Sequence, residues 1–80
     1  MELARVEARL REAFGEDASI KVEDLTGGGD HLRAVVTSRK FVNKSRVEQH
    51  QMVYQALGEW MHKEIHALAL QTAPPDSTET

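Results

Sequence analysis

The chain has 80 residues, a net charge of −3 and no cysteine. This length predicts one small domain, and such domains bury only about 60% of the surface of the unfolded chain, which excludes a large pocket enclosed on every side. Without cysteine, the chain can form neither a disulfide bond nor a thiolate metal site, so a metal would need histidine, carboxylates or sulfur from a partner. The acidic balance argues against general affinity for nucleic acids.

The N-terminal half of the chain predicts a helix followed by a β-hairpin. Apolar residues recur at helical spacing from Leu3 to Phe14, and Gly15 follows as a C-terminal stop. Residues 19–25 then alternate apolar and charged side chains, as do residues 31–38, which is typical of half-buried strands. The glycine-rich stretch TGGGD between them predicts the turn of an antiparallel hairpin.

The C-terminal half predicts a connector, a helix and a last strand. Ser45 and Glu48 have the spacing of a capping box, which indicates where the helix begins. Residues 64–72 predict a covered strand, and the Pro-led residues 74–80 predict a flexible tail behind a single domain at 1–73. The expected apolar stripe of the helix consists of Val47, Val53, Tyr54, Leu57, Trp60 and Met61.

This order of elements predicts an α/β (α+β) fold, α-β-β-α-β, with a three-stranded mixed sheet packed against helices. The last strand follows a helix, so it should run parallel to the strand before that helix through a right-handed crossover. His31 then begins one strand and His66 begins its neighbour. Because neighbouring strands are about 4.8 Å apart, the two imidazoles could share one ligand.

The spacing of the histidines also indicates other roles for them. His50 lies three residues after Val47 and four before Tyr54, which favours a packing role on the apolar face of its helix. His62 and His66 are four residues apart, but the expected change from helix to strand between them argues against a zinc hydrolase motif. From spacing alone, His66 fits a structural role at a helix-to-strand corner or a metal or partner contact, and His31 fits an idle loop position or a ligand.

Half of the ten basic residues lie in one short segment. No acidic residue occurs between Asp30 and Glu48, and this interval predicts either a solvated face or a surface that binds a partner. The segment contains Arg33, Arg39, Lys40, Lys44 and Arg46. No nucleotide-binding loop, nucleophile triad or pair of catalytic carboxylates is legible, so we expect no enzymatic activity.

Longer motifs resemble the BolA family. The pattern F-x-x-K-S-x-V-x-x-H-x-x-V-Y-x-A-L begins at Phe41, and I-H-A-L-A-L-x-T-x-x-P begins at Ile65. The hairpin pattern V-x-D-L-T-G-G-G-D-H-L-R-A-V-V-T-S precedes both, so the resemblance covers about residues 3–75. It implies a fold similar to the class II KH arrangement.

The resemblance also implies a function. BolA-like proteins are partners of monothiol glutaredoxins, and the heterodimer holds a [2Fe-2S] cluster ligated on one side by the glutaredoxin cysteine and a glutathione thiolate. The histidine of the I-H-A motif, here His66, supplies a ligand on the other side, and a second ligand comes from the Gly-rich loop. His31 is the nearest candidate for that second ligand, because the family's loop cysteine is missing. Imidazole ligation is reasonable chemistry, since replacing thiolate by histidine raises the reduction potential.

The partner surface follows from the same resemblance. Lys44 and Arg46, with Arg39 and Lys40 nearby, are expected to shape the docking surface for glutaredoxin. Asn43 stands where the family usually has glycine, and Gln49 where it often has arginine, and both are expected to alter that surface. Alone, the chain is expected to be a monomer or a weak homodimer.

Transcription regulation is the alternative function, because some BolA-like proteins are described as regulators and KH-like folds bind single strands. The basic segment 33–46 could contact DNA phosphates. Against this, no G-x-x-G loop lies between helices, and aromatic stacking platforms are scarce. The N-terminus is too charged for a signal peptide and no apolar run approaches the ~20 residues of a membrane span, so we expect a cytoplasmic protein without membrane contact.

Overall fold

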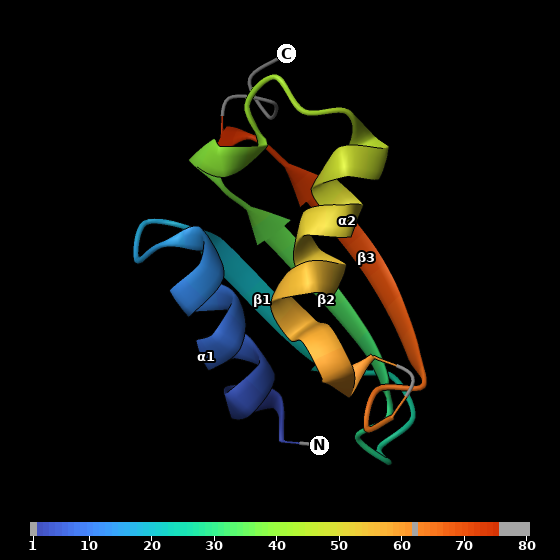
Figure 1. Ribbon diagram of the computed structural model, residues 1–80. Coiled ribbons are helices and arrows are strands. Elements are labelled where there is room, and N and C mark those ends of the chain that lie inside the picture. Colours follow the sequence, from blue (N-terminus) through green and yellow to red (C-terminus); the bar gives the residue numbers. More distant parts are fainter. Residues whose placement is uncertain (1, 62, 76–80) are drawn as a thin grey trace.

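The computed structural model describes residues 2–61 and 63–75, and it contains the predicted order of elements (Figure 1). The helices are α1 (Leu3–Phe14) and α2 (Arg46–Leu57), and the strands are β1 (Ser19–Asp24), β2 (His31–Thr37) and β3 (Ala67–Ala73). Two short 3-10 helices cover Arg39–Phe41 and Gly58–Trp60. His62 and residues 76–80 of the predicted tail lie outside the described residues.

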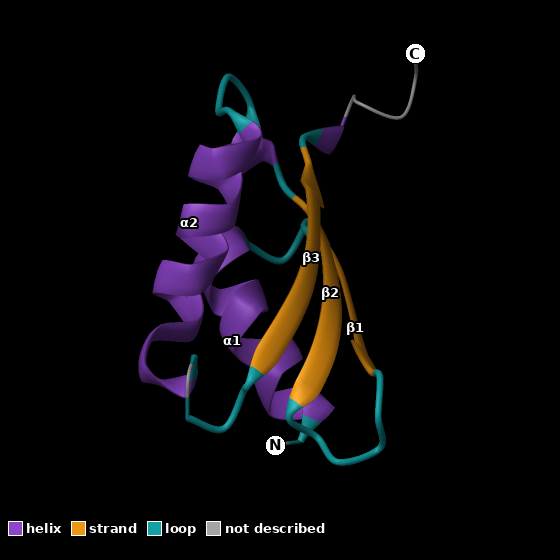
Figure 2. Ribbon diagram, turned by 90° about the vertical axis from the view of Figure 1, so that its right-hand side faces the viewer, coloured by secondary structure: helices purple, strands orange, loops and turns teal. Residues whose placement is uncertain are grey.

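The sheet has the mixed topology that the sequence predicts. Its strand order is β1-β2-β3, with β1 antiparallel to β2 and β3 parallel to β2. Both helices cover the same face of this sheet, and no helix or strand of the described residues covers the opposite face (Figure 2). The predicted α-β-β-α-β class is therefore confirmed. None of the helices in the described part of the chain has the length and apolar character needed to cross a lipid bilayer.

The core lies between the sheet and the two helices. On β2, the side chains of Leu32, Ala34 and Val36 are fully buried, as the predicted alternation requires. Ala18 and Phe41 also belong to the core, and seven more residues come from α1, where they have helical spacing, and from α2 and the segment after it. Those residues are Val6, Leu10, Phe14, Val53, Leu57, Trp60 and Ile65.

The buried face of α2 differs from the predicted stripe. Val53 and Leu57 are fully buried, but Val47 and Tyr54 are exposed, so their assignment to the core was wrong. Gln49 takes the core-facing position one turn before Val53 and is only 7% exposed. At about 100° per residue, Val47 lies far around the helix from the line through Gln49 and Val53.

α2 begins directly after Ser45 as predicted, but it ends before the predicted apolar stripe does, and β3 begins later than predicted. α2 ends at Leu57 because Gly58 adopts a positive φ of 57°, and a 3-10 turn then buries Trp60. β3 begins at Ala67 rather than at residue 64, and the fully buried Ile65 belongs to the connection before it. His66 is therefore the residue immediately before β3 and not a strand residue.

The connector before α2 is more ordered than a simple linker. Phe41 is fully buried and its ring lies 5.1 Å from that of Phe14. Asn43 adopts a φ of 65°, in the left-handed region that glycine and, less easily, asparagine occupy. The predicted capping box is confirmed, because Ser45 Oγ accepts the Glu48 N–H and the Glu48 carboxylate accepts the Ser45 N–H.

Candidate metal centre

The hairpin loop between β1 and β2 is organised by one carboxylate. Asp24 Oδ1 accepts the N–H groups of Thr26 and Gly27, at 3.2 and 2.9 Å, and Asp24 Oδ2 accepts that of Gly29 at 2.9 Å. Gly29 has a φ of 77°, which a residue with a side chain rarely adopts. These bonds fix the course of the loop just before Asp30 and His31.

The backbone of Asp30 joins this loop to the segment before β3. Its carbonyl oxygen accepts the N–H groups of His66 and Ala67, at 2.8 and 3.2 Å. In the parallel register of β2 and β3, His31 is opposite Ala67. The predicted meeting of two strand beginnings is therefore confirmed, and Figure 1 shows the hairpin loop and the segment before β3 at the same end of the sheet.

Three side chains converge at this end. Asp30 Oδ2 lies 3.1 Å from His66 Nδ1 and 3.9 Å from His31 Nε2, and the two imidazole centroids are 6.4 Å apart. One ligand atom from each residue can be chosen so that all three lie within 4.8 Å of one another. The side chains are 38%, 47% and 61% exposed for Asp30, His31 and His66, so a ligand can reach them from solvent.

The charge of Asp30 sets the orientation of His66. The hydrogen bond from His66 holds the pKa of Asp30 below its ordinary value against a smaller opposing effect of desolvation, and the charge of His31 lowers this pKa by a still smaller amount. An ionised carboxylate only accepts hydrogen bonds, so the His66 Nδ1 that faces it carries the proton. Nε2 of His66 then has no hydrogen-bond partner among the described residues and keeps a lone pair for a metal.

The sequence predicted two of the three side chains that converge at this end of the sheet. His31 and His66 are brought together as expected from their positions at neighbouring strand beginnings, whereas Asp30 was not singled out. Its position next to His31, at the end of a glycine-rich loop, was the available signal. Its importance follows from three hydrogen bonds between distant segments, which no local pattern indicates. Two join its carbonyl oxygen to the N–H groups of His66 and Ala67, and one joins its carboxylate to the His66 ring.

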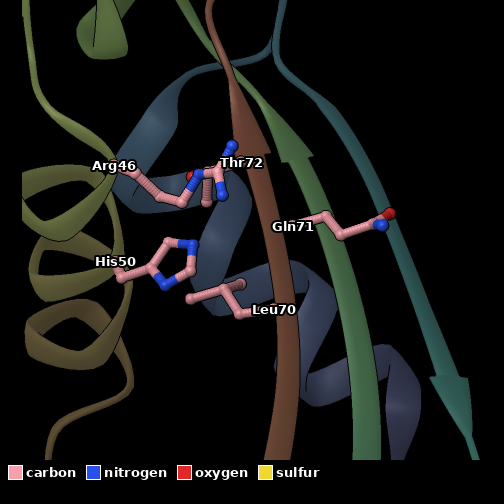
Figure 3. Close-up of a pocket in the computed structure, with 5 residues that line it drawn as sticks. All are labelled: Arg46, His50, Leu70, Gln71 and Thr72. Atoms are coloured by element: carbon pink, nitrogen blue, oxygen red, sulfur yellow. The ribbon is translucent and has the colours of Figure 1, made fainter.

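A second feature consists of two hollows between α2 and β3, which together are here called the α2–β3 groove. Close to the metal centre it forms a hollow of about 420 Å³ lined by Tyr54, Met61, His66, Ala67 and Leu68. Further along it forms a second hollow of about 480 Å³ lined by Arg46, His50, Leu70, Gln71 and Thr72. In Figure 3, His50 and Arg46 reach from α2 towards β3, whereas the side chain of Gln71 points away from α2.

His50 lines this groove and stays half-buried. Its ring meets Tyr54 edge to face, with centroids 6.5 Å apart, and forms no hydrogen bond within the described residues. The expected packing role therefore has an aromatic partner, but that partner lies at the surface rather than in the core.

The basic residues do not form one continuous free patch. Arg39 pairs with Asp17, with its Nε 3.2 Å from Oδ2, and Lys40 Nζ donates to the carbonyl oxygen of Ala13 at 2.7 Å. Lys44 and Arg46 lie near the start of α2, beside the C-terminal end of β3. The length of β3 separates them from His66, roughly 20 Å at about 3.3 Å per residue.

Comparison with known proteins identifies relatives over most of this fold. The BolA-like protein family matches residues 9–77. Human BolA-like protein 3 is 43% identical over 72 residues, which cover 89% of this chain and 66% of that protein. The Escherichia coli DNA-binding transcriptional regulator BolA is 32% identical over 74 residues, which cover 85% of this chain and 70% of the regulator.

Solved structures agree with this assignment. A BolA protein homologue from Coxiella burnetii superposes with a TM-score of 0.80 at 31% identity, over 100% of this chain and 99% of the other. The BolA domain of SufE1 from Arabidopsis thaliana superposes with a TM-score of 0.81 at 25% identity, over 96% and 93% of the two chains. This chain spans about two thirds or less of the length of the human and bovine BolA-like protein 3 sequences.

Proposed function

The chain belongs to the BolA-like family, and on this premise we propose that it is a non-enzymatic adaptor that binds a monothiol glutaredoxin and co-ligates a [2Fe-2S] cluster with it. The observation that carries the proposal is the exposed His66 imidazole, which is held through Nδ1 by Asp30 and keeps Nε2 for a metal. His31 is the second ligand in this proposal, because it begins the neighbouring strand.

The donor set fits a cluster that two proteins share. The cluster and its thiolates bring the redox chemistry, and a chain without cysteine leaves the sulfur ligands to glutaredoxin and glutathione. This chain contributes neutral nitrogen donors. Asp30 fixes the tautomer and the orientation of His66, which is the usual role of a carboxylate behind a metal-binding histidine.

The α2–β3 groove is the surface that we propose for docking. One of its hollows is lined by His66 and Tyr54 and the other by Arg46, so a partner bound at the metal centre can extend along α2. Tyr54 offers an exposed aromatic ring in the middle, and Arg46 offers a charge at the far end. Arg39 and Lys40 contribute less in this arrangement, because both already have partners within the chain.

Reconstitution with glutaredoxin tests this function. The chain is mixed with a monothiol glutaredoxin, glutathione, iron and sulfide, and visible absorption and circular dichroism are recorded. We expect a spectrum that differs from that of the glutaredoxin homodimer and that is lost in His66→Ala but retained in His50→Gln. An unchanged heterodimer spectrum in His66→Ala would exclude the ligand role of His66.

Transcription regulation is the second candidate, because relatives from Escherichia coli and Haemophilus influenzae carry the name DNA-binding transcriptional regulator BolA. Within the described residues of this segment, Lys44 and Arg46 have neither an ion pair nor a side-chain hydrogen bond, so they are the basic side chains that could contact phosphates. Titration of fluorescent duplex and single-stranded DNA at two salt concentrations tests it. Tight, sequence-dependent binding without glutaredoxin would favour this function over the adaptor.

A further inference from the structure

We propose that Asp30, His31 and His66 form a mononuclear site for one divalent transition-metal ion, which this chain binds on its own, without glutaredoxin. The proposal shares two ligands with the cluster site, but it does not depend on the proposed function, because it requires neither sulfide nor a partner. It assigns a direct ligand role to the carboxylate of Asp30, which in the cluster complex only orients His66.

The distances between the three side chains suit a single ion. Nitrogen and oxygen ligands lie about 2.0–2.2 Å from Zn²⁺, so two ligands of a tetrahedral ion are about 3.4 Å apart. The observed distances from Asp30 Oδ2 are 3.1 Å to His66 Nδ1 and 3.9 Å to His31 Nε2. In this mononuclear site His66 therefore binds the ion through Nδ1, and its proton moves from Nδ1 to Nε2. Shifts of about 1 Å close the set, and exposed side chains can make them by small rotations about their χ angles.

The backbone places these ligands before any ion arrives. The Asp24 carboxylate holds the loop on one side of Asp30, and the Asp30 carbonyl holds the N–H groups of His66 and Ala67 on the other. Three ligands from two segments far apart in the sequence are therefore fixed relative to one another by hydrogen bonds. A site organised in this way loses less conformational entropy when it binds an ion.

The donor types select the class of ion. Two imidazoles and one carboxylate favour Zn²⁺, Co²⁺, Ni²⁺ or Fe²⁺, whereas Ca²⁺ and Mg²⁺ require mostly oxygen ligands. Three protein ligands also leave a coordination position for water or for a group from another molecule. An ion in this site occupies His66, so the ion and the shared cluster exclude one another.

Titration of the isolated chain with Co²⁺ and Zn²⁺ tests the proposal. The chain carries no polyhistidine tag, and neither glutathione nor glutaredoxin is present. We expect one equivalent of Co²⁺ to give visible d–d absorption bands, which one equivalent of Zn²⁺ abolishes. Asp30→Asn and His31→Gln should each weaken Co²⁺ binding at least about tenfold, and His66→Gln should do the same.

Three control variants make the result specific. Asp17→Asn removes the same charge at the opposite end of the sheet, and His50→Gln removes an imidazole from the α2–β3 groove, so both should retain the parent affinity. His62→Gln should also retain it. Parent affinity in Asp30→Asn, or loss of binding in His62→Gln alone, would overturn the proposal.

The two proposals can fail separately. If the isolated chain binds no Co²⁺ while the glutaredoxin complex still shows a His66-dependent cluster spectrum, the mononuclear site is refuted and the adaptor function stands. If Co²⁺ binds through the three residues but no heterodimer spectrum forms, the mononuclear site stands and the adaptor function is refuted.

Discussion

Gln49 joins three parts of the fold by hydrogen bonds, and its replacement gives a quantitative prediction. Its side-chain Nε2 donates to the carbonyl oxygen of Lys44 at 2.9 Å, and its Oε1 accepts the hydroxyl of Thr72 at 2.7 Å. Gln49 thus links the connector and β3 to the beginning of α2 by hydrogen bonds. Its side chain is buried, and the residue is only 7% exposed. The side chain is directed into the protein, and its effect on the partner-facing surface stays a prediction.

The change Gln49→Leu keeps the volume and removes both bonds. Each bond contributes about 0.5–1.5 kcal/mol, so the free energy of unfolding should fall by roughly 1–3 kcal/mol. In a domain of this size, 1 kcal/mol corresponds to about 4–8 °C in Tm. Thr72→Val removes one bond and should cost about 1 kcal/mol.

Urea and thermal unfolding of Gln49→Leu, Thr72→Val and the double variant measure these values. A double-mutant cycle should give a coupling energy of about 0.5–1.5 kcal/mol between the two residues. Because Gln49 and Thr72 lie near the C-terminal end of β3, the Co²⁺ affinity of the metal centre should not change. A stability within about 0.3 kcal/mol of the parent, or a coupling energy near zero, would refute this account of Gln49.

Three further predictions concern the helix cap and the metal centre. Ser45→Ala should lower the free energy of unfolding by about 1 kcal/mol, because it removes the acceptor of a helix N–H. Ser45→Asp should retain most of the stability of the parent, because aspartate is also a good N-cap residue. Equal urea midpoints for the parent and both variants would contradict this. Asp24→Ala should weaken Co²⁺ binding about tenfold, because the loop before the ligands loses three hydrogen bonds. The same Co²⁺ affinity in Asp24→Ala and in the control Asp17→Ala would contradict the claim that this loop holds the ligands in place. The pKa of Asp30 lies below its ordinary value of 3.8, so the stabilisation from its bond to His66 is fully present above that pH and is lost as the pH falls through the lowered pKa. In a carboxyl ¹³C NMR titration its midpoint should lie below 3.8 and rise in His66→Ala, and a midpoint at or above 3.8 in the parent would be inconsistent with the hydrogen bond.

The fold could be predicted because its signals are local. Helical spacing, strand alternation and the capping box of Ser45 each depend on residues within one or two turns. Together with the handedness of the crossover, they predict that His31 and His66 lie at the same end of the sheet. The sequence therefore indicated His31 and His66, two of the three side chains of the candidate metal centre.

The remaining features depend on contacts between distant segments. Asp30 acquires its role from a carbonyl and a carboxylate that both bond to the segment before β3. Gln49 is buried because Lys44 and Thr72 satisfy its amide, and composition alone places glutamine at the surface. Likewise, the sequence places Arg39 and Lys40 in one basic segment, but in the fold each binds a different partner near the end of α1. Arg39 pairs with Asp17, and Lys40 donates to the carbonyl oxygen of Ala13.

Ligation by His66 is the central claim, and pulsed electron paramagnetic resonance tests it most directly. The chain is labelled with ¹⁵N-histidine and assembled with unlabelled glutaredoxin, glutathione and a [2Fe-2S] cluster, which is then reduced by one electron. The account predicts strong ¹⁵N hyperfine couplings from His66 and His31 that are retained in His50→Gln, whereas the coupling from His66 is missing in His66→Ala. A reduced cluster in the heterodimer without any strong ¹⁵N coupling, or with the same coupling in His66→Ala, would contradict it.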